Sequence, residues 1–187
     1  MLALSAVKNN DRVGLVLFTD RVERFVPPKR GRKHALRIVS QILLHKPAHQ
    51  ATSLEPPLST LRHSLHRRAI SFLISDFLAP IESYQTPLTL ATRRHDVVPV
   101  VLRDPLEDEL PNLGLLAVQD PETGELGYVD TRSRAVREAY QKEMQRRDQA
   151  RDKLFARLGL DQIRLLAGED YVKTLVAFFR RREKRAA

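Results

Sequence analysis

The stretch AISFLISDFLAP, residues 69–80, decides the fold class. It is an apolar, strand-like run that ends on one acid, Asp76, which Phe77 follows at once. A short and nearly continuous apolar run predicts a strand in the middle of a sheet, with both faces covered. A carboxylate at the end of such a strand is costly to place unless something pairs with it. Asp76 is therefore the first candidate functional residue.

Further strand-like runs alternate with helical patterns on both sides of this stretch. RVGLVLF, residues 12–18, predicts a buried strand, and VERFVP predicts a short antiparallel edge strand that Pro27 and Pro28 stop. Residues 96–102 predict another strand, which Pro99 demotes to a position with a free amide side. The other predicted elements are a helix from Gly31 to Pro47, a helix over 54–65, a helix over 84–94, a hairpin over 114–130, a charged helix from Thr131 or Ser133 to about Leu158, a strand over 162–167 and a helix over 169–184.

Strands that alternate with helices through right-handed crossovers predict an α/β fold with a Rossmann-like, doubly wound and mostly parallel sheet. We expect a single domain over residues 1–187, with the hairpin and the long charged helix inserted at about 114–159. In such sheets, ligands bind outside the carboxyl ends of the strands. Asp76 follows one such end and Asp20 follows another, so both are candidates for a binding site.

The composition suits a globular protein in a reducing compartment. Of the 187 residues, 42% are hydrophobic and 29% are charged, which is enough apolar surface for a packed core. The sequence has no cysteine, which excludes disulfides and thiolate metal sites and fits the cytoplasm, where we expect this protein. No apolar run reaches the roughly 18 residues of a membrane-spanning helix, so we expect no membrane span. The opening MLALSAVKNNDR turns polar too soon for a signal peptide.

The motifs of common nucleotide-binding and hydrolytic enzymes are absent from the sequence. It contains no GxGxxG or GxxxxGK[ST] phosphate loop, no GxSxG elbow and no thiol nucleophile. The histidines do not favour zinc, because Pro47 separates His45 from His49 and arginines crowd the other pair. Thr52, in the loop before a helix, and Asp76 instead offer the hydroxyl and carboxylate oxygens that Mg²⁺ or Mn²⁺ prefers. A metal-dependent hydrolase ranks last, because no credible general base lies near Asp76, and we expect a non-enzymatic protein.

Charge is unevenly distributed along the chain, whose formal net charge is +9. Residues 103–130 carry eight acids and one base, whereas the tail RRREKR carries five bases and one acid. Such a tail is usually a solvated helix end that complements the helix dipole. The alternative is a nucleic-acid-binding module that uses this tail. We rank it second, because aromatic residues are few and no nucleic-acid motif appears. The basic residues of this alternative site are Arg180, Arg181, Arg182, Lys184 and Arg185.

Sequence motifs along nearly the whole chain resemble one bacterial family. VPPKRGR, ISDF and DPLEDELP together are specific, and they lie within longer similar stretches at residues 9–39, 69–77 and 93–125. These stretches resemble a family of von Willebrand factor A-like proteins that is catalogued as a domain of unknown function, number fifty-eight. The resemblance implies a non-enzymatic adaptor or chaperone-like partner of a MoxR-type AAA+ ATPase, with a metal-ion-dependent adhesion site.

The adhesion site of the A-like fold combines a DxSxS loop after the first strand, a threonine in a later loop and an aspartate after the central strand. Thr52 matches that threonine and Asp76 matches that aspartate. We place partner contacts on the neighbouring residues Asp20, Ser53 and Phe77. No DxSxS occurs in this sequence, so we expect the chain to be truncated at its N-terminus and to lack the first strand of that fold.

The expected gap has two consequences. The missing strand would lie between the strands at residues 12–18 and 69–75, and its loop would supply most of the ligating side chains. We therefore expect binding of Mg²⁺ or Mn²⁺ by Thr52 and Asp76 to be weak or absent. Two apolar strand edges would also lack a partner, and such edges recruit other chains, so we expect self-association through them.

Overall fold

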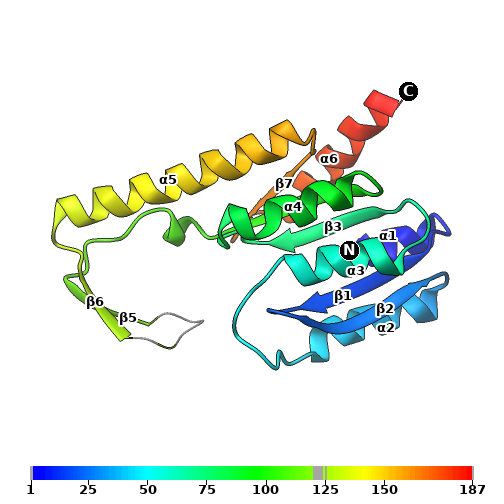
Figure 1. Cartoon of the computed structure of the whole chain (residues 1–187), viewed down its shortest axis with the longest axis horizontal. Coiled ribbons are helices and arrows are strands. Elements are labelled where there is room, and N and C mark those ends of the chain that lie inside the picture. Colours follow the sequence, from blue (N-terminus) through cyan, green and yellow to red (C-terminus); the bar gives the residue numbers. More distant parts are fainter. Residues whose placement is uncertain (1, 120–123, 125, 187) are drawn as a thin grey trace.

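A computed structural model describes residues 2–119, 124 and 126–186 of the chain (Figure 1). The predicted strands and helices are present, close to the predicted positions. The strands are β1 (Val13–Phe18), β2 (Val22–Lys29), β3 (Ile70–Ser75), β4 (Asp96–Arg103), β5 (Leu115–Gln119), β6 (Leu126–Asp130) and β7 (Ile163–Leu166). The helices are α1 (Leu2–Lys8), α2 (Arg32–Leu44), α3 (Glu55–Ser64), α4 (Ile81–Thr92), the 3-10 turn η1 (Pro105–Glu107), α5 (Arg134–Arg157) and α6 (Tyr171–Ala186).

A parallel sheet in the order β3–β4–β7 has helices on both faces (Figure 1). Its central strand, β4, is buried on both sides. Val97 and Val101 belong to a cluster with side chains of α3, α4 and α5, whereas Val98 and Val100 belong to a cluster with α6. Burial on two faces explains why this strand is a continuous apolar run. The prediction of a mixed α/β protein with a parallel sheet is confirmed.

Pro99 lies in the central strand of this sheet, so the prediction that it demotes the strand was wrong, although one side of the strand is unpaired at Pro99 in the described structure, as expected. It is in register with Leu73 of β3. The ladder between β4 and β7 begins only at Val100. On the β7 side, a missing amide hydrogen at Pro99 therefore removes no ladder bond, and the proline is tolerated because the neighbouring strand is short.

Strands β1 and β2 form a separate antiparallel pair. β2 continues through Pro27 and Pro28 to its end, so the prediction that these prolines stop it was wrong. The register shifts around Gly14 of β1, opposite the prolines. A Cβ on Gly14 would lie 2.9 Å from the Val26 carbonyl oxygen and 3.0 Å from the Pro28 ring. The irregular pairing therefore depends on a glycine, which lets the two strands approach closely.

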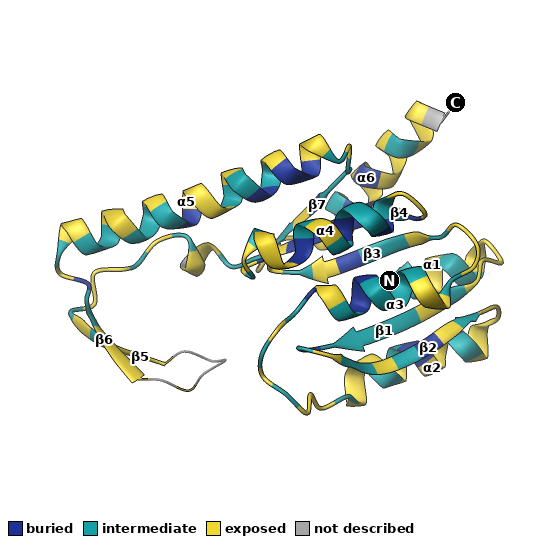
Figure 2. Cartoon of the chain, in the orientation of Figure 1, coloured by how far each residue is buried: buried dark blue, intermediate teal, exposed yellow. Residues whose placement is uncertain are grey.

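No ladder joins β1 to β3 in the part of the chain that the structure describes. The two strands nevertheless point the same way (Figure 1), and Phe18 of β1 and Leu73 of β3 belong to the same hydrophobic cluster. β3 is only partly buried (Figure 2), with Ile70 60% and Ile74 48% exposed. The single doubly wound sheet that we expected is thus divided into a three-stranded parallel sheet and a separate antiparallel pair.

A long arm extends from the parallel sheet. It consists of α5 and, beyond its first turn, the hairpin of β5 and β6 (Figure 1). Ser133 caps α5, since its hydroxyl accepts a hydrogen bond from the backbone of the first turn. Thr131, the other predicted cap, holds the hairpin instead: its hydroxyl donates to the Gly114 carbonyl and accepts from the Leu113 amide. The hairpin and the charged helix are confirmed; the predicted turn DPETG lies, apart from Gly124, outside the described residues.

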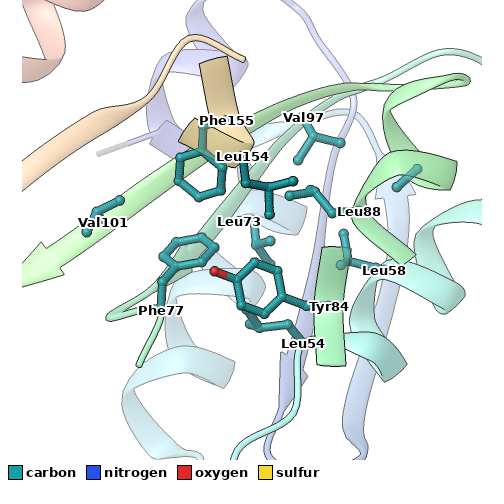
Figure 3. Close-up of a cluster of buried hydrophobic side chains, with 11 residues drawn as sticks. Leu54, Leu58, Leu73, Phe77, Tyr84, Leu88, Val97, Val101, Leu154 and Phe155 are labelled. Carbon is teal, nitrogen blue, oxygen red and sulfur yellow. The ribbon is translucent and has the colours of Figure 1, made fainter. Parts of the chain in front are cut away.

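The larger hydrophobic cluster lies between the parallel sheet and helices α3, α4 and α5 (Figure 3). Tyr84 of α4 is fully buried in it, with its ring centroid 6.0 Å from that of Phe77. Leu54, just before α3, belongs to the same cluster. The residues that follow Asp76 and Ser53 are therefore both anchored in one core. None of the described helices is long and apolar enough to cross a membrane.

Candidate functional site

The carboxyl ends of β1 and β3 lie at the same end of the molecule, and the loop before α3 passes beside them (Figure 1). Asp20 follows β1 and Asp76 follows β3, while Thr52 and Ser53 lie in the loop. Thr52 and Asp76 are exposed, and Asp20 and Ser53 are half-buried. The residues predicted from the sequence therefore gather along one edge of the fold.

A backbone hydrogen bond ties the loop to the end of β1. The Ser53 amide donates to the Thr19 carbonyl oxygen over 2.9 Å. Thr19 is only 7% exposed, and its hydroxyl lies 3.0 Å from Oε1 of Glu23 and 3.2 Å from Oδ1 of Asp20. The position of Ser53 is thus set by the turn between β1 and β2.

Glu23 is the residue of this site that sequence reasoning missed. Its side chain is 6% exposed. Its carboxylate accepts hydrogen bonds from the backbone amides of Ala48 (2.9 Å) and His49 (3.3 Å), and Nε2 of His45 lies 2.5 Å away. Burial alone would raise the pKa of Glu23, but the hydrogen bonds from Ala48, Thr19 and His45 together lower it. The ionised carboxylate of Glu23 therefore holds the loop before α3 in place. The only signal in the sequence was an acid inside a short apolar strand.

The carboxylate of Asp20 is already engaged by its neighbour. Nε and Nη2 of Arg21 donate to its two oxygens over 3.0 and 2.9 Å. This pairing, against some desolvation, lowers the pKa of Asp20 to about 2. A partner that binds Asp20 must therefore compete with Arg21.

Asp76 ends β3 in a tight turn. Its Oδ1 accepts from the Leu78 amide (3.2 Å) and from the Ser75 hydroxyl (3.3 Å). Phe77 has a positive φ of 58° and is 5% exposed. Strain of this kind persists only where the surroundings hold it in place, and here the ring packing of Phe77 does so. The buried Phe77 thus directs the chain so that Asp76 stays at the surface.

The two predicted metal ligands do not by themselves fit a resident Mg²⁺ or Mn²⁺. These cations take about six oxygen ligands in well-defined geometry. Thr52 and Asp76 would supply two, and one oxygen of Asp76 already accepts hydrogen bonds. Among the described residues, no group of three or more His, Asp or Glu side chains could hold a metal ion.

The basic tail lies on α6, and part of it is bound to the rest of the molecule. Arg182 pairs with Asp96 at 2.6 Å, and Arg185 pairs with Asp161 at 2.7 Å. The guanidinium of Arg181 lies 5.6 Å from the ring centroid of Phe178. Of the alternative nucleic-acid residues, Arg180, Arg181 and Lys184 are exposed with no ion pair in the described structure. The tail thus offers fewer free charges to a phosphate backbone than its sequence indicates.

Comparison with known proteins gives a family and a fold. A family model described as "Protein of unknown function DUF58" matches residues 1–150. The crystal structure of the conserved hypothetical protein BatB from Bacteroides thetaiotaomicron matches 100% of this chain and 86% of its own, with a TM-score of 0.57 and 12% sequence identity. At that identity the likeness concerns the fold alone.

The similar curated sequences come from mycobacteria. An uncharacterized protein of Mycobacterium tuberculosis is 32% identical over 116 residues, which are 61% of this chain and 36% of the relative. An uncharacterized protein of Mycobacterium avium is 35% identical over 101 residues, 53% of this chain and 59% of the relative. The matched part thus spans little more than a third of the tuberculosis protein.

Proposed function

Because the chain belongs to the DUF58 family, we propose that it is a non-enzymatic protein–protein interaction domain of von Willebrand factor A-like type. Its partner in this proposal is a MoxR-type AAA+ ATPase, for which it acts as an adaptor or chaperone-like protein. The partner and the A-like fold rest on the resemblance of the motifs around Pro27, Asp76 and Pro105.

The observation that carries this proposal is that the exposed acid Asp76 lies next to residues that are anchored in the core. Asp76 and Thr52 are exposed, yet the chain around them is fixed by Phe77 and Leu54 in the core and by the Ser53–Thr19 hydrogen bond. A preorganised surface of this kind binds a partner with little loss of conformational freedom. Asp76 and Thr52 present oxygens at the surface, and in this proposal they contact a partner.

In this proposal, a metal ion has only a minor role. We propose that Mg²⁺ or Mn²⁺ binds weakly or not at all to this chain alone, because Thr52 and Asp76 leave most coordination positions to water. A partner's carboxylate could complete such a site. Titration calorimetry with each cation, on this chain and on an N-terminally extended version, tests the point. Equal, tight binding by both proteins would contradict it.

Binding to a purified MoxR-type ATPase from the same organism tests the partner. We expect the wild-type chain to bind and Asp76→Ala to bind at least about tenfold more weakly, as for loss of a central interface contact. Asp11→Ala is the matched control, since Asp11 is an exposed acid just before β1, at the opposite end of the strand. No binding by the wild type would refute the partner; equal binding by wild type and Asp76→Ala would refute the site.

A further inference from the structure

A cavity of about 310 Å³ lies beside β2 and α2, on the stretch that contains the motif VPPKRGR. Its lining includes Arg24, Phe25, Pro27, Lys29, His34 and Arg37. Gly31, with a φ of +101°, makes the turn between the strand and the helix. This turn brings Lys29 of β2 and Arg37 of α2, eight positions apart in the sequence, to one cavity.

Only a minority of the lysines and arginines in the described chain form ion pairs, and the cations of this cavity do not. Arg21, Arg132 and many arginines of α5 pair with carboxylates. Arg24, Lys29 and Arg37, in contrast, form no ion pair within the described part of the chain. Like charges that converge repel one another, and an anionic ligand relieves that repulsion.

One acid, Glu23, also lines the cavity, but its oxygens are turned to other partners. They accept hydrogen bonds from Thr19 and from the backbone of the loop before α3, and His45 lies against them. His34 is fixed as well, since its Nε2 lies 2.9 Å from the Val13 carbonyl oxygen and must donate to it. The cavity therefore presents cationic groups while its single carboxylate is occupied.

We propose that this cavity binds a phosphate monoester. Three cations and one acid leave a formal charge of +2 around it, which complements the charge of about −1.5 to −2 on a phosphate monoester near neutral pH. The guanidinium forks of Arg24 and Arg37 suit the oxygens of such a group, and Lys29 adds a point charge. A ligand that carries only one carboxylate would leave part of this positive charge uncompensated.

The size of the cavity limits what can enter. A volume of about 310 Å³ is at the low end for small-molecule sites, so it suits one phosphate and a small organic group. A second cavity of about 330 Å³ shares Glu23 and Arg24 with the first and adds Lys46. The organic group of the ester can extend into it. This site shares Glu23 with the candidate site described above, but its cations are not used by the proposed function, and the inference does not depend on that function.

Titration calorimetry tests the proposal on the full chain. The two probes are inorganic phosphate and N-acetyl-phosphoserine amide, with sodium chloride at equal ionic strength as the control for general screening. We expect saturable binding of the phosphoserine probe at millimolar concentration or below, weaker binding of inorganic phosphate, and little heat from chloride. Tighter binding of inorganic phosphate than of the phosphoserine probe would contradict the assignment of a monoester.

The variant Arg24→Gln/Arg37→Gln should weaken phosphate binding by more than about tenfold, because it removes both guanidinium forks. Arg32→Gln is the matched control, since Arg32 is an exposed cation of the same helix that does not line the cavity; it should bind like the wild type. Circular dichroism verifies that each variant is folded. Failure of the wild type to bind either probe, or equal binding by the double variant, would overturn the proposal.

Discussion

The amide of Ser53 donates a hydrogen bond to the carbonyl oxygen of Thr19, 2.9 Å away, and this bond joins the loop before α3 to the end of β1. The two residues are 34 positions apart, and Glu23 accepts hydrogen bonds from the Thr19 hydroxyl and from the Ala48 amide in the same loop. The candidate site is therefore held together by contacts between the turn after β1 and the loop before α3, which are remote in sequence.

Replacing Glu23 with Gln should loosen this loop. Glutamine keeps one oxygen for the hydrogen bonds from Thr19, Ala48 and His49, but it loses the negative charge and the second oxygen, which lies 2.5 Å from Nε2 of His45. We expect amide exchange at Ala48 and His49 to become faster by about tenfold, as for loss of a charged acceptor. Hydrogen exchange by mass spectrometry measures it, with Glu55→Gln, an exposed acid of α3, as control. Unchanged exchange would show that the loop is held by other contacts.

The contribution of Glu23 to the stability of the fold should depend on pH. The folded-state pKa of Glu23 lies below its usual value of 4.5, so its contribution to stability is complete above that value. This contribution is lost as the pH falls through the lower, folded-state pKa. The stability difference between wild type and Glu23→Gln should therefore shrink in acid, which denaturant unfolding at several pH values would reveal.

Tyr84 carries a buried hydroxyl with no hydrogen-bond partner in the described structure, and burial raises its pKa to about 12. Tyr84→Phe should therefore raise the free energy of unfolding by about 1 kcal/mol, because it removes an unsatisfied polar group. Tyr140→Phe is the control, since the Tyr140 hydroxyl donates to the Glu107 carbonyl at 2.8 Å. Urea unfolding should show the two changes with opposite signs. A loss of stability in Tyr84→Phe would mean that its hydroxyl has a partner.

His95 should make the fold sensitive to mild acid. It is 2% exposed, and burial, with the nearby charge of Arg94, lowers its pKa below the usual 6.5. The unfolded chain then binds the proton more readily, so stability falls as the pH drops below about 6.5, by at most about 1.4 kcal/mol per pH unit. His95→Gln should reduce this slope, and His63→Gln, at an exposed position, should not. Identical slopes in the wild type and His95→Gln would contradict the assignment.

The free edges of β1 and β3 should cause self-association. Each strand is paired on one edge only in the described structure, and Ile74 of β3 is 48% exposed. We expect light scattering to detect concentration-dependent oligomers, and Ile74→Lys to reduce them, because a charge on an edge strand opposes pairing. Leu43→Lys, at an exposed apolar position of α2, should have less effect. A monodisperse wild-type monomer with a cooperative melt would show that the edges are closed.

Local patterns were sufficient to predict the order of strands and helices, because apolar periodicity and caps act over a few residues. Ser133 at the start of α5 is an example. The effect of Pro99 was predicted wrongly, because a proline is tolerated in β4 only where β7 does not pair with it, and β7 begins more than 60 residues later. Glu23 was missed for the same reason: its partners other than Thr19 lie 22 to 26 positions away. Contacts of that range cannot be read from propensity.

The arm formed by α5 should also govern how the protein moves through solution. The helix has 24 residues, roughly 36 Å at 1.5 Å per residue, and none of them before Met144 is buried. A compact chain of this length has a radius of gyration of roughly 16 Å. With a solvated rod projecting from its side, this 21.4 kDa protein should give a larger value in small-angle scattering. Its frictional ratio should exceed that of a sphere, so it should sediment more slowly than its mass suggests.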